Sequence, residues 1–174
     1  MYINDKMDKI ETPILFKIIT FAGGLIAGFL ILRIFITPVI ITDESMSPNY
    51  RKGDLVLILK HFTPRKGNAA LYEFPEDSGK ASLKRVIAAE GDRIEIVDKT
   101  ILIDDAKKDF PWKTSSTDNR ALSAPFSHRD NMDQIIIGKN EFFMIGDNLD
   151  FSFDSRETGT IKKSNIIGYV IFKI

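Results

Sequence analysis

Hydrophobic and polar positions along the chain follow two patterns, one at the N-terminus and one in the remainder. Residues 18–32 carry no charge. Pro13 suits the first position of a helix, and Pro38 disfavours helix at the residue before it. A helix of about 24 residues rises about 1.5 Å per residue and spans about 36 Å, enough to cross about 30 Å of hydrocarbon. The pattern predicts a transmembrane helix within segment 13–37, after a short cytoplasmic or external segment at 1–12.

The apolar run has two other interpretations. A core helix of a soluble protein is normally apolar on one face, whereas this run is apolar all round. A cleaved signal peptide needs a small-residue cleavage site after the run, and residues 36–45 offer none. Gly24 and Gly28 have the spacing of a helix-pairing motif, but glycines are also simply tolerated in membrane helices. The membrane helix is therefore the favoured interpretation.

The charges beside the run do not orient it. An excess of basic residues marks the cytoplasmic side of a membrane helix. Three basic residues lie near each end of the run: Lys6, Lys9 and Lys17 on one side, and Arg33, Arg51 and Lys52 on the other. The charge pattern therefore leaves the orientation open.

The remaining residues, 38–174, show the alternation and the branched side chains of β-strands. We expect strands in five segments: 54–62, 68–74, 92–104, 141–147 and 165–174. The third segment, DRIEIVDKTILID, predicts two strands around a tight turn at Asp98 and Lys99. Residues 105–134 are polar with two prolines, which predicts a long excursion on the surface or edge of the sheet. The pattern indicates a mostly β domain with a strongly bent antiparallel sheet.

The composition of the chain excludes several kinds of catalytic and binding site, but says little about the fold. The chain has 174 residues and a formal net charge of zero, which argues against a general nucleic-acid binder. It has no cysteine, which excludes disulfides, thiolate zinc sites and cysteine nucleophiles. It has two histidines, His61 and His128, so a histidine-rich metal site is not expected. A catalytic base is better sought among other residue types.

Lys84 is a candidate base because the apolar residues VIAA follow the pair Lys84-Arg85, a pattern typical of a buried strand. Burial disfavours the charged form of a lysine and lowers its pKa. A free lysine with a pKa of about 10.4 is neutral in about one molecule in a thousand near pH 7.4, a difference of about 4 kcal/mol. A desolvated lysine avoids this cost and can take a proton from a serine hydroxyl. The simpler interpretation is an exposed lysine.

Ser45 is a candidate nucleophile for such a base. It lies in TDESMSPNY, residues 42–50, soon after the apolar run. Serine and proline together are also common in plain turns. Two further segments, RKGDLVLI at 51–58 and MIGDNLDFSFDSRETG at 144–159, combine turn residues with charges. Taken singly, each is equally typical of a turn or of a weak surface ion pair.

Four segments in combination resemble the signature segments of type I signal peptidases. They follow the apolar anchor in this order: ESMSP, KGDLVLI, LKRVIAAEGDRIEI and GDNLDFSFDSRETG. The resemblance covers roughly Arg33 to the C-terminus. It implies a bent antiparallel signal-peptidase-like domain and a serine endopeptidase that removes signal peptides from exported proteins, cutting after small residues. It also implies a single-pass protein of the inner or plasma membrane, with segment 1–12 in the cytoplasm and the catalytic domain outside. Preproteins and the lipid bilayer are then its partners, with no metal or cofactor.

The resemblance assigns roles to individual residues. Ser45 matches the nucleophile and Lys84 the general base, and the backbone N–H of Ser45 is expected to donate to the oxyanion. Ser152 matches a serine whose hydroxyl holds the lysine in position. The other supporting positions are Arg85, Asp147, Asn148, Asp154 and Arg156. Among these, Arg85 and the last two match a charged cluster that braces the site.

Asp43 departs from the family pattern, which often has a small or hydroxyl residue two positions before the nucleophile. An ionised carboxylate cannot donate to an oxyanion, and the loss of one donor raises the barrier by about 2.7–4 kcal/mol. Three alternatives stay open: a specialised maturase of the same fold for pilins or a conjugation factor, an inactive membrane-anchored peptide-binding domain, and another Ser–Lys protease such as a self-cleaving repressor. The repressor class carries a DNA-binding domain where this chain has its apolar run.

Overall fold

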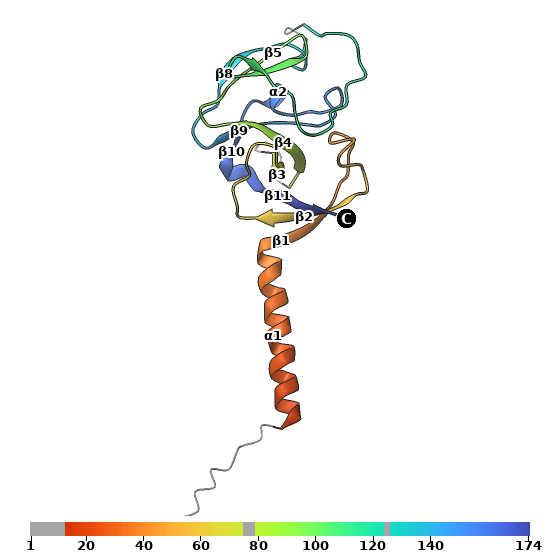
Figure 1. The fold of residues 1–174 in the computed structure, drawn as a ribbon, viewed down its shortest axis with the longest axis vertical. Helices are drawn as coiled ribbons and strands as arrows, with labels where there is room; N and C mark the ends of the chain where they lie inside the picture. The colour runs from red at the N-terminus through yellow and green to blue at the C-terminus, as the bar shows by residue number, and fades with distance from the viewer. Residues whose placement is uncertain (1–12, 75–78, 124–125) are drawn as a thin grey trace, which may run out of the picture. The chain divides into compact units, whose positions relative to one another are not determined.

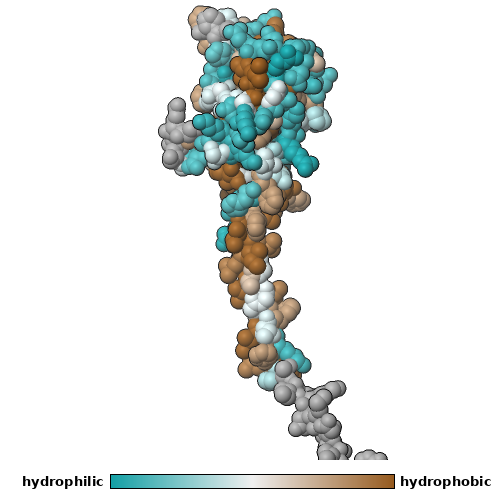
Figure 2. Space-filling model, turned by 90° about the vertical axis from the view of Figure 1, so that its left-hand side faces the viewer, coloured by the Kyte–Doolittle hydropathy of each residue, from teal (hydrophilic) through white to brown (hydrophobic). Residues whose placement is uncertain are grey.

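The computed structural model of the protein describes residues 13–74, 79–123 and 126–174, so the predicted segment 1–12 lies outside the described residues. The chain divides into two compact units, residues 1–35 and 36–174. In the described part of the first unit, helix α1 (Ile14–Phe35) begins directly after Pro13 (Figure 1). All its side chains are exposed, and the face seen in Figure 2 is mostly apolar. Its length and composition are sufficient to cross a membrane, as predicted.

The helix ends two residues before the limit of the predicted segment 13–37. The next residues form strand β1 (Ile36–Ile40), which pairs with β2 (Leu55–Lys60). Four of the five β1 residues are β-branched, and such residues favour extended backbone. The exception, Pro38, is tolerated because β1 is an edge strand.

Seven antiparallel strands form the larger sheet, in the order β1–β2–β11–β3–β4–β9–β10. The strands not yet introduced are β3 (Ala69–Glu73), β4 (Ala81–Ala89), β9 (Glu141–Ile145), β10 (Ile161–Lys162) and β11 (Ile166–Lys173). Register shifts interrupt the ladders of β4 and β11, and such irregularities bend a sheet. Where β11 crosses β2, an added Cβ at Gly168 would lie 2.2 Å from the Leu59 carbonyl oxygen, so only glycine fits. The mostly β, bent antiparallel fold is confirmed.

Four strands form a second, smaller sheet, in the order β7–β6–β5–β8. They are β5 (Arg93–Val97), β6 (Thr100–Ile103), β7 (Ala106–Lys107) and β8 (Met132–Ile136). The predicted turn between β5 and β6 is confirmed, because Asp98 and Lys99 have the left-handed φ values of 45° and 66° that tight hairpin turns require. Apolar residues of this sheet pack with Ile87, Phe143 and Ile145 of the larger sheet in one core cluster. Two short helical turns, α2 (Ser155–Thr158) and η1 (Lys163–Asn165), lie between β9 and β11 in sequence.

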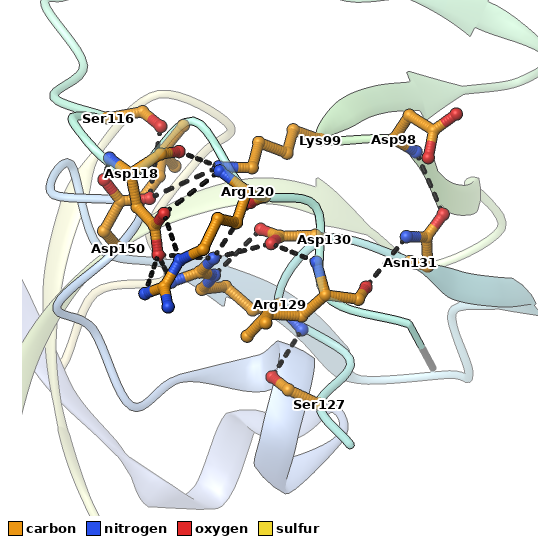
Figure 3. Close-up of polar contacts among 12 residues, drawn as sticks. Asp98, Lys99, Ser116, Asp118, Arg120, Ser127, Arg129, Asp130, Asn131 and Asp150 are labelled. Carbon is orange, nitrogen blue, oxygen red and sulfur yellow. Dashed lines mark hydrogen bonds and ion pairs between the residues drawn. The ribbon is translucent and has the colours of Figure 1, made fainter. Parts of the chain in front are cut away.

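The segment 105–134, predicted as an excursion on the surface or edge of the sheet, contributes a strand near each of its ends: β7 and β8 are the two edge strands of the second sheet. Between them, apart from residues 124 and 125, which are not described, polar contacts fasten the segment (Figure 3). Arg129 Nη2 lies 2.7 Å from Asp130 Oδ2 and 3.3 Å from Asp118 Oδ2. Asp150 accepts the Asp118 backbone N–H at 2.8 Å. The network therefore ties the segment to the loop after β9, which carries several predicted site residues.

Candidate active site

Ser45 and Lys84 lie together, although 39 positions separate them in the sequence. Ser45 is in the turn that follows β1, and Lys84 is in the first half of β4. The distance from the Lys84 Nζ to the Ser45 Oγ is 2.8 Å. Both residues are buried, with exposed fractions of 2% for Lys84 and 6% for Ser45. The pair therefore has the geometry that a serine nucleophile and its general base require.

The turn that carries Ser45 is fixed by the loop after β9. The Ser45 carbonyl oxygen accepts the Asn148 backbone N–H at 2.9 Å. The Asn148 side-chain amide donates to the Glu44 carbonyl oxygen at 3.3 Å. Met46 is buried in a core cluster with residues of β2, β3 and β4. Contacts on both sides of Ser45 thus hold the hydroxyl on a rigid support.

The environment of Lys84 favours its neutral form. Burial lowers the pKa of the Lys84 amine, and the nearby carboxylates of Asp43 and Asp154 oppose this effect without cancelling it. In the part of the chain that the structure describes, the amine hydrogen-bonds to hydroxyl groups, those of Ser45 and Ser82. A lysine with a lowered pKa is neutral, and so able to accept a proton, in a larger fraction of molecules near neutral pH than an exposed lysine.

The backbone N–H of Ser45, the expected oxyanion donor, is occupied by Asp43. It donates to Asp43 Oδ1 at 2.8 Å. Burial raises the pKa of the Asp43 carboxyl, but hydrogen bonds from Ser45 outweigh burial, so the pKa is lowered overall. Asp43 is therefore ionised near neutral pH and points toward the position where negative charge develops during acyl transfer.

Ser82 occupies the position beside Lys84 that the resemblance to signal peptidases predicted for Ser152. Its Oγ lies 2.7 Å from the Lys84 Nζ. The Ser152 hydroxyl is buried close to the Asp154 carboxylate, whose pKa it helps to lower, and makes no hydrogen bond to Lys84. Because side chains two positions apart on a strand point to the same face, the spacing of Ser82 and Lys84 is a signal that could have identified this contact.

The predicted charged cluster is two separate ion pairs. Arg85 binds Asp147 with two hydrogen bonds, Nε to Oδ1 at 2.7 Å and Nη2 to Oδ2 at 2.5 Å. Arg156 binds Asp154 through Nε at 2.9 Å and Nη2 at 2.8 Å. All four side chains belong to buried residues. Arg85 therefore pairs with Asp147 and does not join Asp154 and Arg156.

The Arg85–Asp147 pair joins the loop after β9 to β4 beside Lys84, whereas the Asp154–Arg156 pair lies within the segment that follows β9. Asp154 also accepts the Gly146 N–H at 2.9 Å and caps α2. Burial raises the pKa of Asp154, but contact with Arg156 outweighs it and keeps the carboxylate charged. Removing one partner of a buried pair typically costs about 3–5 kcal/mol, because the other charge is left uncompensated. The paired charges are thus structural supports of the site.

Two hollows adjoin the dyad. A cleft of about 540 Å³ is lined by Ser45, Lys84, Asp43 and the aromatic rings of Phe74, Phe151 and Phe153, among others. A hollow of about 40 Å³ is lined by Ile41, Met46, Leu71 and Leu83, and shares Asp43 and Ser82 with the cleft. Within the described ranges, no group of three or more His, Asp or Glu side chains is placed to hold a metal ion.

Comparisons with known proteins cover most of the chain. Residues 14–174 match the family described as "Signal peptidase, peptidase S26". Signal peptidase IB of Staphylococcus aureus (strain COL) is 29% identical over 174 residues, which cover 94% of this chain and 90% of that protein. Thylakoidal processing peptidase 1, chloroplastic, of Arabidopsis thaliana is 30% identical over 150 residues, 78% of this chain and 41% of that protein. A crystal structure of a signal peptidase I from Enterococcus faecalis V583 aligns with 62% of this chain and 97% of its own, with a TM-score of 0.48 and 19% identity. Because the family match begins with α1 and extends to the last residue, this chain belongs to the signal peptidase family, peptidase S26.

Proposed function

We propose that this chain is a serine endopeptidase that removes N-terminal signal peptides from exported preproteins with a Ser45–Lys84 dyad. The proposal depends above all on the 2.8 Å contact between the buried Lys84 amine and the Ser45 hydroxyl. A buried lysine with a lowered pKa can remove a proton from serine near neutral pH, the role that histidine has in other serine proteases. Membership of the signal peptidase family supports the same reaction class.

The proposed reaction has two stages. In the first, the Ser45 oxygen attacks the carbonyl carbon of the scissile peptide while its proton passes to Lys84 Nζ. Lys84 then gives this proton to the leaving amine, the C–N bond breaks, and the acyl group remains as an ester on Ser45. In the second, Lys84 takes a proton from water and the water oxygen attacks the ester carbon. The bond between that carbon and the Ser45 oxygen then breaks, the acyl group leaves as a carboxylic acid, and Lys84 returns the proton to the Ser45 oxygen.

Asp43 has to move before the first stage. The oxyanion forms beside the Ser45 N–H, which in this structure donates to the Asp43 carboxylate. A carboxylate in that position repels the developing charge and withholds a donor that is worth about 10²- to 10³-fold in rate. Substrate binding is therefore proposed to displace the Asp43 side chain. In the resting site, before a peptide binds, the Ser45 N–H is not available to an oxyanion.

The surroundings of the dyad suit an extended peptide with a small side chain beside the cut. β4 pairs with β3 along Ala81–Arg85, but β9 pairs only with the part of β4 from Arg85 onward. The edge of β4 beside Lys84 therefore has no strand neighbour in the described part of the chain, and a peptide can add there as a strand. The hollow of about 40 Å³ lined by Ile41, Met46 and Leu83 then has room for only a small side chain.

Helix α1 supports a membrane location. Its side chains are exposed in the structure, and hydrocarbon would cover the apolar ones. A signal peptide is also apolar, and a protease anchored in the same bilayer meets it at a raised effective concentration. We accordingly propose a single-pass protein of the inner or plasma membrane, with residues 36–174 on the outer side and preproteins and lipid as its partners.

Cleavage of paired preproteins tests the proposed substrate. With the full chain in detergent micelles, a preprotein with alanine directly before the cut should be cleaved about 10- to 100-fold faster than one with leucine there, because overfilling a packed pocket costs about 1–3 kcal/mol. Leucine two positions before the cut is the matched control: its side chain points to the opposite face of an added strand, so its rate should stay near that of the parent. Equal rates with alanine and leucine directly before the cut would refute the proposed pocket.

The alternatives give different outcomes in the same experiment. A specialised maturase would leave general preproteins uncut, yet Ser45 would still be acylated by a small activated ester. An inactive peptide-binding domain would retain preproteins without cutting them and would not be acylated. Asp43 on the Ser45 N–H is the observation that favours this last reading.

A further inference from the structure

Lys84 has two hydroxyl partners, and the proposed reaction uses only one of them. Its Nζ lies 2.8 Å from Ser45 Oγ and 2.7 Å from Ser82 Oγ. Ser82 is 8% exposed and lies on β4, where it pairs with the fully buried Tyr72 of β3. A buried amine needs acceptors for its hydrogens, since an unpaired buried polar group is unfavourable. Ser82 provides such an acceptor from a rigid strand.

We infer that Ser82 is a positioning residue for Lys84: its hydroxyl oxygen accepts one amine hydrogen and thereby turns the free electron pair of the neutral amine toward Ser45. The inference rests on the proposed roles of Ser45 and Lys84. A neutral lysine amine has two hydrogens and one electron pair, and it rotates freely unless a hydrogen bond fixes it. Ser45 must deliver its proton to that electron pair, so an amine hydrogen needs a second acceptor.

A hydroxyl suits this position better than a carboxylate does. A carboxylate in contact with the amine would stabilise its charged form and keep the base protonated. The nearest carboxylates have other partners, Asp43 the Ser45 N–H and Asp154 the Arg156 guanidinium. The Ser152 hydroxyl makes no hydrogen bond to Lys84 and lies against Gly146, where an added Cβ would come within 2.3 Å of it. Among the residues that the structure describes, Ser82 is thus the one placed to orient Lys84 without adding a charge beside it.

Kinetics of Ser82 variants test the inference. Ser82→Ala should lower kcat about 10- to 100-fold and leave KM within about threefold of the wild-type value, since the lost hydrogen bond acts on the base and not on substrate binding. The charged form of Lys84 also loses an acceptor, so the rising limb of the pH–rate profile should move to lower pH. Ser82→Thr keeps the hydroxyl and should recover most of kcat. Ser164→Ala, at an exposed serine of η1, is the matched control and should behave as wild type.

An NMR titration of isotope-labelled lysine separates this inference from the proposed function. The Lys84 signal reports its protonation without substrate, and the pKa of Lys84 should be lower in Ser82→Ala than in wild type. If wild type cleaves and Lys84→Met does not, while Ser82→Ala matches wild type in kcat and in the titration, Ser82 has no positioning role and the proposed function stands. A Ser82→Ala defect confined to KM would also overturn the inference. Should Ser82→Ala not fold, Ser82→Cys gives the same comparison, because sulfur keeps the volume but accepts hydrogen bonds weakly.

Discussion

Lys84→Met is expected to lower kcat/KM for preprotein cleavage by about 10³-fold or more, and Ser45→Ala by a similar factor. Methionine fills nearly the volume of lysine but cannot take the Ser45 proton, which is the step that the 2.8 Å contact serves. Because the two residues act as a unit, the double variant should be no slower than either single variant. Cleavage of a preprotein by the full chain in detergent micelles measures all three rates.

The fold of these variants must be shown to be intact for the rates to be informative. Near-ultraviolet circular dichroism should be unchanged in Lys84→Met, because methionine removes an ionisable group from a buried position and adds no charge. Lys163→Met, at an exposed lysine of η1, is the matched control and should keep the wild-type rate. A folded Lys84→Met variant with more than about a tenth of wild-type activity would rule out Lys84 as the base.

Asp43→Ala is expected to raise kcat about 10- to 100-fold, since it frees a backbone donor for the oxyanion and removes a repelling charge. The Asp43 carboxylate also raises the pKa of Lys84, so its loss lowers that pKa and increases the neutral fraction of the base near neutral pH. Both effects increase the rate near neutral pH. Asp43→Ser should also be faster than wild type, since its hydroxyl can itself donate to the oxyanion.

Asp43→Asn separates the two effects in the same assay. The amide oxygen of asparagine can still accept the Ser45 N–H, but the charge is gone. Its rate should therefore lie between those of wild type and Asp43→Ala, with the pH–rate profile shifted to lower pH as in Asp43→Ala. If Asp43→Ala is instead slower than wild type, Asp43 supports the reaction and does not have to leave the Ser45 N–H.

The parts of the fold that could be predicted are those whose structure depends on residues close together in the sequence. The β5–β6 hairpin was predictable because Asp98 and Lys99 mark a tight turn between two alternating segments. β1 could not be separated from α1, because the same apolar run continues through both and only pairing with β2 makes it a strand. β8 begins among polar residues in the sequence NMDQ, and its strand character comes from β5 beside it.

The site was predictable as a set of residues, but not as a set of contacts. Ser45 and Lys84 could be proposed from the order of four short segments, whereas their contact depends on how the turn after β1 lies against β4. Arg85 binds Asp147, 62 positions away, and no local pattern indicates that partner. The direction of the Asp43 side chain is likewise set by the turn geometry around Ser45.

The pH dependence of kcat/KM for wild-type cleavage tests the role of Lys84 most directly, because this profile reports the pKa values of the free enzyme's acid and base. Lys84 must be neutral to accept the proton, so the rate should rise with pH through the pKa of Lys84. Since burial lowers that pKa, the midpoint of the rise should lie below 10.5, the ordinary value for lysine. A rate that does not depend on pH between about pH 6 and about pH 10, or that rises only at the ordinary lysine value, would contradict a buried Lys84 base.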